Sequence, residues 1–260
     1  MSNNLLRLTS WNLLNGRSLV HGQADRKVLE TAMRNFFDEF QPDVLGIQEV
    51  DDAQQRSGDF NQSEFIAELM GAEYWRYTPT LFGTPGESWS DKGEDSQEAS
   101  YGIGLISRIE VKKWHMKKLH KAPFGLPLAI PTEKGIRLRY IPDEPRVVLA
   151  AELIDGTIIA TTHLSFVPGF NILQLKAASK WLKSLRSNSR IVLMGDFNLP
   201  WGLAEKFSPF QSLTTAKSYP SWSPKVQFDY ILGSKDISGS EIKHKQGQIS
   251  DHLPISVVIQ

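Results

Sequence analysis

Two polar residues, an acid and an amide, follow a short apolar run late in the sequence. Asp196 and Asn198 stand at alternate positions after residues 191–195, which read as a buried strand ending at a glycine. In extended geometry both side chains point the same way, where they can bind a cation or a phosphate. The alternative is ordinary turn chemistry after a strand. Matching chemistry at other strand ends is what separates the two interpretations.

Similar residues recur at or near the ends of other predicted strands. These strands cover residues 5–14, 44–51, 157–162 and 226–232, and a last strand covers 255–259. If the strands share one face of a sheet or sandwich, their polar ends converge on a single site. The complete set is Asn12, Glu49, His163, Asp196, Asn198, Asp229, Asp251 and His252.

The residue types in this set predict metal-assisted hydrolysis. Carboxylate and amide oxygens are hard donors suited to Mg²⁺, Mn²⁺ or Ca²⁺. The chain has no cysteine, which excludes disulfides, thiolate zinc sites and cysteine nucleophiles. Two histidines supply proton transfer near neutral pH.

Each residue could also play a purely structural role. His163 can be a satisfied core histidine, Asp229 can pair with an arginine, and Asp251 can cap a turn. The functional interpretation depends on all of the residues lying together.

The elements that position this set form a layered pattern. Amphipathic helices are predicted over residues 26–40 and 171–185, and a short helix over 63–70 has Ser63 as its cap. Residues 146–154 and 157–162 form a hairpin joined by Asp155-Gly156. A strand over 101–107 is predicted to pair with residues 110–116. Long loops are expected over 78–99 and 121–135, and a cluster of basic residues flanks the second loop.

Composition favours one soluble domain spanning residues 1–260. Hydrophobic residues make up 40% of the chain, and 29 basic residues balance 29 acidic ones. This balance gives no general basic field for nucleic acid. The N-terminal residues lack the pattern of a signal peptide, and no apolar run is long enough to span a bilayer. We therefore expect a cytoplasmic protein that does not enter a membrane.

Seven short motifs, in order, resemble the endonuclease/exonuclease/phosphatase superfamily of DNase I-like metal-dependent phosphoesterases. They are Trp-Asn (11–12), Gln-Glu-Val (48–50), Ser-Tyr-Gly with Leu-Ile-Ser-Arg (100–108), Thr-His-Leu (162–164), Gly-Asp-Phe-Asn (195–198), Phe-Asp-Tyr-Ile (228–231) and Ser-Asp-His-Leu-Pro (250–254). The resemblance implies an α/β (α+β) fold, a four-layer sandwich of two packed, mainly antiparallel β-sheets flanked by helices. It also implies hydrolysis of a phosphodiester or phosphomonoester by an activated water.

The resemblance assigns a role to each motif residue. Glu49 matches the principal metal ligand, and Asn12 and Asp251 match further ligands. Asp196 and Asn198 match the pair that contacts the attacking water and the phosphate, or a second metal.

The histidines match the groups that move protons and contact the phosphate. His252 corresponds to the catalytic histidine, Asp229 to the acid that orients it, and His163 to the histidine at the phosphate or leaving group. Relatives often place phosphate-contacting groups near Tyr140 and Arg146. The family's Gly-Asn after the tyrosine is Gly102-Ile103 here, so one amide contact is missing.

The resemblance leaves the substrate open. Thr-His-Leu favours the deoxyribonuclease, sphingomyelinase and phosphatase branches over the abasic-site endonucleases. Neutral net charge disfavours tight binding to duplex nucleic acid, so a small or single-stranded phosphate ester is favoured, and a monomer is expected. The alternatives are a nuclease acting on DNA or RNA, a catalytically silent binding protein on the same fold, and an all-β carbohydrate-binding module.

Overall fold

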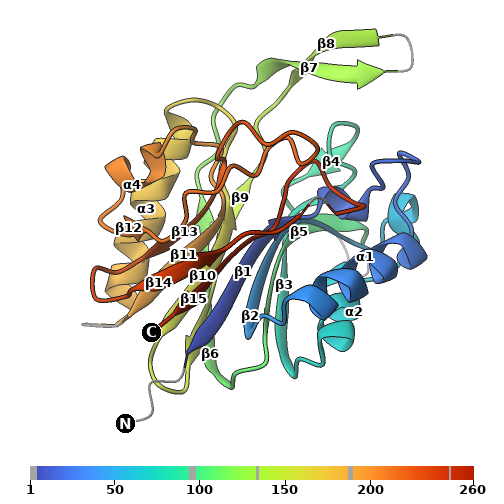
Figure 1. Ribbon diagram of the computed structural model, residues 1–260. Helices are drawn as coiled ribbons and strands as arrows, with labels where there is room; N and C mark the ends of the chain where they lie inside the picture. The colour runs from blue at the N-terminus through green and yellow to red at the C-terminus, as the bar shows by residue number, and fades with distance from the viewer. Residues whose placement is uncertain (1–4, 94–97, 133–134, 187–189, 246) are drawn as a thin grey trace.

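Two β-sheets pack face to face and carry helices on their outer sides (Figure 1). The computed structural model describes residues 5–93, 98–132, 135–186, 190–245 and 247–260. The first sheet has seven strands in the order β14-β15-β1-β2-β5-β3-β4, and the second has six in the order β12-β13-β11-β10-β9-β6. The strands of the first sheet are β14 (Gly239–Ile242), β15 (Ile255–Ile259), β1 (Leu6–Asn12), β2 (Val44–Asp52), β5 (Ser100–Ser107), β3 (Tyr74–Gly83) and β4 (Trp89–Ser90).

The second sheet and a projecting ribbon complete the strands. The second sheet contains β12 (Gln211–Ser212), β13 (Asp229–Gly233), β11 (Ile191–Asp196), β10 (Ile158–His163), β9 (Arg146–Leu153) and β6 (Val111–Leu119). Strands β7 (Leu126–Thr132) and β8 (Gly135–Ile141) pair only with each other and extend beyond the sandwich (Figure 1).

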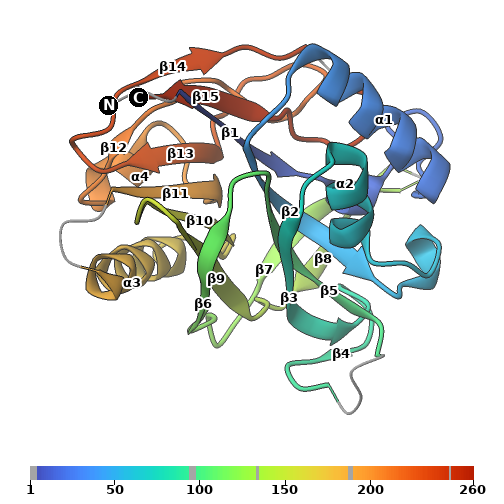
Figure 2. The same cartoon turned by 90° about the horizontal axis from the view of Figure 1, so that it is seen from below.

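Helices cover both outer faces, so the molecule has four layers (Figure 2). Helices α1 (Arg26–Glu39) and α2 (Gln62–Met70) pack on the first sheet through apolar residues such as Phe36 and Ile66. Helices α3 (Phe170–Leu185) and α4 (Leu203–Phe207) pack on the second sheet. A third apolar cluster, including Leu8, Leu149 and Val192, fills the space between the sheets. The predicted four-layer α/β sandwich is confirmed.

Most neighbouring strands are antiparallel, but two pairs are parallel. β1 pairs with β2, and β10 pairs with β11, each after a crossover that contains a helix. In a parallel pair both strands end at the same edge of the sheet. Asn12 therefore lies opposite Gln48, and His163 lies opposite Asp196.

The two sheets approach closely near this edge. A Cβ at Gly46 would lie 2.8 Å from Thr161 Oγ1 and 2.9 Å from Met194 Cε, so only glycine fits there. Beside it, Gln48 Nε2 donates to Thr161 Oγ1 across the sheets at 2.9 Å. This close contact holds the ends of β2 and β10 together.

Several local predictions need correction. Residues 111–119 pair with β9 rather than with residues 101–107, because β9 gives them a full-length partner. Asn61, not Ser63, caps α2: its side chain accepts from Glu64 N. The segment over 78–99 is less open than expected, since β3 continues to Gly83 and β4 pairs with it. Residues 94–97, within that predicted loop, and 133–134, within the second, lie outside the described residues.

Candidate active site

A bulge in β2 directs Glu49 into the site. The pairing of β2 with β5 shifts register between Gln48 and Val50, and Glu49 has a φ of +56°. A bulge re-aims one side chain without ending the strand. The sequence predicts that this strand ends in residues 48–51, and the structure extends β2 to Asp52.

Asn12, the last residue of β1, joins the carboxylates of the two sheets. Its Nδ2 donates to Glu49 Oε1 at 2.9 Å and to Asp196 Oδ2 at 3.1 Å. Its Oδ1 accepts from Leu14 N at 3.1 Å, which fixes the orientation of the amide. Asn12 therefore holds Glu49 and Asp196 on either side of a single amide.

One oxygen of Asp196 lies at the centre of the cluster. Asp196 Oδ2 is 3.6 Å from His163 Nε2 and 3.7 Å from His252 Nε2. The register of the second sheet explains this, because Asp196 lies opposite both His163 on β10 and Asp229 on β13. Asp196 Oδ1 accepts from Asn198 N at 2.9 Å, which holds the carboxylate in place.

His252 and Asp229 form a short, buried pair. His252 Nδ1 lies 2.7 Å from Asp229 Oδ2, leaving Nε2 directed toward Asp196. The sequence predicted Asp229 in the middle of a strand, but in the structure Asp229 is the first residue of β13. Ser218 Oγ also donates to Asp229 Oδ2, whereas the buried Oδ1 has no partner among the described residues. Asp229 therefore anchors the histidine in one orientation.

His163 and Asn198 meet on the opposite side of Asp196. Asn198 Nδ2 lies 3.3 Å from His163 Nε2 and donates to Leu164 O at 3.0 Å. Asn198 has a φ of +50°, so the extended geometry predicted after the strand is wrong. The left-handed turn brings the side-chain amide back toward His163. Asn171 Nδ2 holds the turn by donating to the backbone carbonyl of Asn198 at 2.9 Å.

Burial and neighbouring acidic residues disfavour the charged forms of Glu49 and Asp196. Burial, together with the charge of Asp251, raises the pKa of Glu49 to about 7, although the hydrogen bond from Asn12 opposes this. Burial and the neighbouring Asp229 raise the pKa of Asp196 to about 6. The site thus concentrates carboxylates without an equal number of cationic side chains.

The two histidines differ in charge. Burial lowers the pKa of His163 well below its usual value, and the charges of Arg146 and His252 lower it further. Burial also opposes the charge of His252, but Asp229 and Asp196 outweigh it and raise the pKa to about 10. In the protein without a bound cation, His163 is neutral and His252 carries a proton near neutral pH.

The donor set fits a hard divalent cation. The charges of Asp251 and Asp196 raise the pKa of Glu49, so a cation bound between these carboxylates would stabilise the charged form of Glu49. A buried group of Asp196, Asp229 and His252 could also hold an ion, since each offers one ligand atom and these atoms lie within 4.8 Å of one another. Asn12 faces the cluster through Nδ2, so ligation through its oxygen stays a prediction.

The remaining predicted residues lie at different distances from the cluster. Asp251 is half-buried, and its charge acts on both Glu49 and His252. Arg146, at the start of β9, is 3% exposed, and its charge acts on His163. Its Nη2 lies 3.5 Å from Glu144 Oε2, and its Nε has no partner among the described residues. Tyr140 lies on the β8 ribbon, 57% exposed, and its hydroxyl accepts from Gly125 N, so the structure does not bring it into the cluster.

Two serines that were not predicted as site residues support the site. Ser218 reaches Asp229 from a loop 11 positions away. Ser250 Oγ donates to Asn12 O at 2.6 Å and accepts from His252 N at 3.1 Å, linking two motifs. Ser250 belongs to a recognised motif, which was a usable signal, whereas nothing in the sequence marks Ser218.

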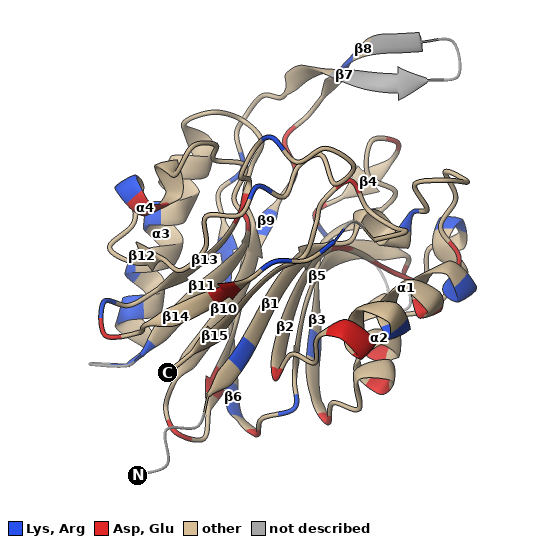
Figure 3. Ribbon diagram, viewed as in Figure 1, with Lys and Arg blue, Asp and Glu red and all other residues tan. Residues whose placement is uncertain are grey.

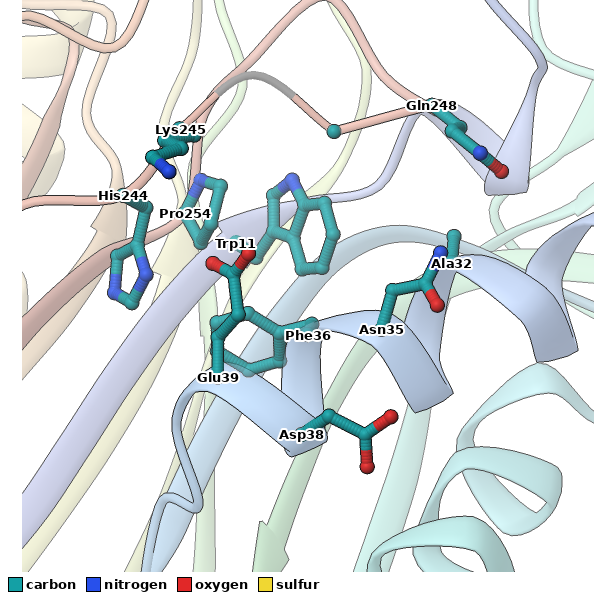
Figure 4. A pocket seen from close by; sticks show the side chains of 11 residues that line it. Trp11, Ala32, Asn35, Phe36, Asp38, Glu39, His244, Lys245, Gln248 and Pro254 are labelled. Carbon is teal, nitrogen blue, oxygen red and sulfur yellow. The ribbon is translucent and has the colours of Figure 1, made fainter.

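A separate hollow lies between α1 and the segment that joins β14 to β15 (Figure 4). Its volume is about 410 Å³, and Trp11, Phe36, Glu39 and His244 are among its lining residues. Trp11 Nε1 donates to His252 O at 3.0 Å, so the hollow shares a wall with the histidine segment. None of the predicted site residues lines it, and it is distinct from the candidate active site.

These features define an α/β sandwich with a buried acid, amide and histidine site at one edge. A model of the Endonuclease/Exonuclease/phosphatase family matches residues 9–252. The chain belongs to this family, whose members generally hydrolyse phosphoester bonds and typically depend on a divalent metal. No curated protein matches the chain by sequence.

Solved structures share the fold at low sequence identity. An endonuclease/exonuclease/phosphatase from Beutenbergia cavernae is 16% identical, with a TM-score of 0.69 over 99% of this chain and 72% of that one. The human Nocturnin catalytic domain is 17% identical, with a TM-score of 0.62 over 98% and 93%. The mannosyl-6-phosphatase Bt3783 of Bacteroides thetaiotaomicron is 15% identical, with a TM-score of 0.57 over 98% and 99%.

Proposed function

We propose that this protein is a divalent-metal-dependent phosphoesterase that hydrolyses a small or single-stranded phosphate ester. The observation that carries the proposal is the position of Asp196 Oδ2, within 3.7 Å of a histidine on each side and bonded to the amide that also holds Glu49. The groups proposed for metal binding, proton transfer and phosphate binding therefore all lie close to Asp196.

Glu49 and Asp251, with Asn12, would hold the cation. The short contact between His252 Nδ1 and Asp229 Oδ2 pairs these two residues with each other, which favours the Glu49 side over the group of Asp196, Asp229 and His252. A divalent cation held by these residues would neutralise the charge of the phosphate and stabilise its developing oxyanion.

His252 and Asp229 would transfer the proton. The short Nδ1 contact to Asp229 fixes the tautomer, and Nε2 faces the site. With its Nε2 proton lost, His252 can accept a proton from the attacking water, whose oxygen forms a bond to phosphorus as the bond to the leaving oxygen breaks. Asp196 is the alternative base, and we favour the His252–Asp229 pair because its geometry is fixed.

Neutral and cationic groups would bind the phosphate. His163, neutral and next to Asn198, can donate through Nδ1 while Nε2 accepts from Asn198. The buried Nε of Arg146 lacks a partner within the described ranges, which supports a phosphate contact. A contact between Tyr140 and the substrate stays a prediction.

Charge distribution supports a small or single-stranded substrate. Among the described residues, Lys and Arg occur on helices, strands and loops alike (Figure 3). Duplex binding depends on many phosphate contacts from clustered basic groups. No helix in the part of the chain that the structure describes is long and apolar enough to cross a membrane.

A phosphoester panel tests the proposal. It should contain an aryl phosphodiester, sugar phosphates (as the mannosyl-6-phosphatase neighbour supports), single-stranded oligonucleotides and duplex DNA. We expect turnover with Mg²⁺ or Mn²⁺ that chelator and Glu49→Ala abolish. Preference for duplex DNA would favour a nuclease, and no turnover across the panel would favour a silent binding protein.

A further inference from the structure

A second cavity opens directly beside Glu49. Its volume is about 590 Å³, and it lies between the segment after β1, the turn η2 (Gln55–Ser57) and β5. Arg17, Gln23, Arg56 and Tyr101 line it together with Glu49. A group of the substrate that extends past Glu49 would enter this cavity, which is large enough for part of a small molecule.

The segment that carries Arg17 is held in place partly by the residues that directly precede Asp251 and His252. Arg17 pairs with Ala24, and Ser18 pairs with Ile249. Ser250 N donates to Arg17 O at 3.0 Å, directly before Asp251 and His252. The backbone at Arg17 is therefore fixed relative to the proposed cation site before any ligand binds.

The two arginines of the cavity have different partners. Arg56 donates Nε and Nη2 to the buried Asp51 at 2.9 and 2.6 Å, so its charge is largely balanced while Nη1 is not committed to this pair. Arg17 is exposed, and its Nε donates to the neutral Gly22 O at 2.8 Å. Among the described residues no ion pair involves Arg17. Arg17 thus brings to the cavity a positive charge that no ion pair among the described residues balances, and the Gln23 amide and the Arg56 guanidinium line the same cavity.

We propose that this cavity, which we call the Arg17 pocket, binds a second phosphate of a small substrate whose scissile phosphate lies at Glu49. The proposal rests on the proposed phosphoesterase function and specifies its substrate class. Guanidinium groups match the geometry and charge of a phosphate through paired hydrogen bonds. The favoured substrates are therefore compact bisphosphates rather than monophosphates.

The test compares matched substrates and a binding measurement. Turnover of glucose 1,6-bisphosphate is compared with that of glucose 1-phosphate and glucose 6-phosphate, using wild type, Arg17→Gln and Arg17→Lys. We expect kcat/KM to be about tenfold higher for the bisphosphate, through KM, because one charge-assisted contact contributes roughly this factor. Arg17→Gln should remove the preference and Arg17→Lys should keep part of it.

Two controls isolate the contribution of Arg17. Arg34→Gln removes a comparably exposed arginine on α1, paired with Glu30, and should leave the preference unchanged. Calorimetric binding of the bisphosphate and monophosphates to His252→Ala, with and without Arg17→Gln, tests the pocket without turnover. If the preference in binding persists while no phosphoester is hydrolysed, the proposed function fails and the pocket stands.

Three outcomes would overturn the proposal. No bisphosphate preference in either turnover or binding would remove the second-phosphate site. An equal loss on bisphosphate and monophosphates in Arg17→Gln would assign Arg17 to the scissile phosphate. A loss confined to a short single-stranded oligonucleotide would show that the second phosphate belongs to a nucleic acid strand.

Discussion

Glu49 and Asp196 belong to different sheets, and both accept a hydrogen bond from the same nitrogen, Nδ2 of Asn12. The proposed cation ligand and the centre of the histidine cluster are therefore joined by one side chain. This arrangement depends on the packing of one sheet against the other, and the function of each half depends on the other half.

Replacing Glu49 with Gln should abolish metal-dependent turnover while leaving the protein folded. We expect a loss of more than about a hundredfold, because the principal anionic ligand is removed without changing its size. The rise in Tm that Mg²⁺ or Mn²⁺ produces in the wild type should disappear. The metal-free Tm should not fall, since the substitution removes repulsion from Asp251 and Asp196. A metal-induced rise in Tm that survives would exclude Glu49 as a ligand.

Substitution of the proton-transfer pair should reduce kcat with little effect on metal binding. His252→Ala and Asp229→Asn should each lower kcat by about 10²–10⁴-fold, the range for a general base. Titration of Mn²⁺ by calorimetry reports metal binding separately. Ser218→Ala, which removes only a supporting hydrogen bond to Asp229, should have a smaller effect. An unchanged kcat in His252→Ala would remove this histidine from the mechanism.

Gly195→Ala should destabilise the fold by roughly 3 kcal/mol or more. A Cβ at Gly195 would lie 1.8 Å from Thr162 O on the neighbouring strand, and its φ is +147°. Gly71→Ala is the matched control, because Gly71 also has a positive φ but no atom within 4 Å of the added Cβ. Urea unfolding should give a loss of about 1 kcal/mol for the control. Equal losses would show that backbone conformation alone, and not the close approach to β10, requires glycine at 195.

His244 should make stability depend on pH. Burial lowers the pKa of His244 below its usual 6.5, and its ring packs against Phe36 and Phe40. The unfolded chain therefore binds this proton more readily, so the contribution is complete above about pH 6.5 and is lost as the pH falls toward the folded pKa. The free energy of unfolding of His244→Gln, from urea unfolding at pH 8, 6 and 5, should approach that of the wild type as the pH falls. The exposed His21→Gln serves as the control, and parallel pH profiles for wild type and His244→Gln would contradict the prediction.

The sequence by itself determined the layers and the residue types of the site. The periodicity over residues 26–40 and 171–185 predicted α1 and α3 to within one residue at each end, because an amphipathic helix repeats a local pattern. Seven ordered motifs indicated the family and its fold. The sequence did not show that residues 111–119 pair with β9, because strand pairing depends on contacts distant in sequence.

Tertiary structure decided how the site residues meet. The bulge at Glu49, where the pairing of β2 with β5 shifts register, turns its side chain into the site. The left-handed turn at Asn198 directs the Asn198 side chain away from the direction that an extended strand would give it. Tyr140 and Arg146 are close in the sequence, yet one lies on the projecting ribbon and the other in the buried sheet. The sequence therefore supplied the chemical groups, and the packing of two sheets set their distances. Those distances depend on residues far apart in the chain. The backbone carbonyl of Asn12, for example, accepts a hydrogen bond from the hydroxyl of Ser250, 238 positions later.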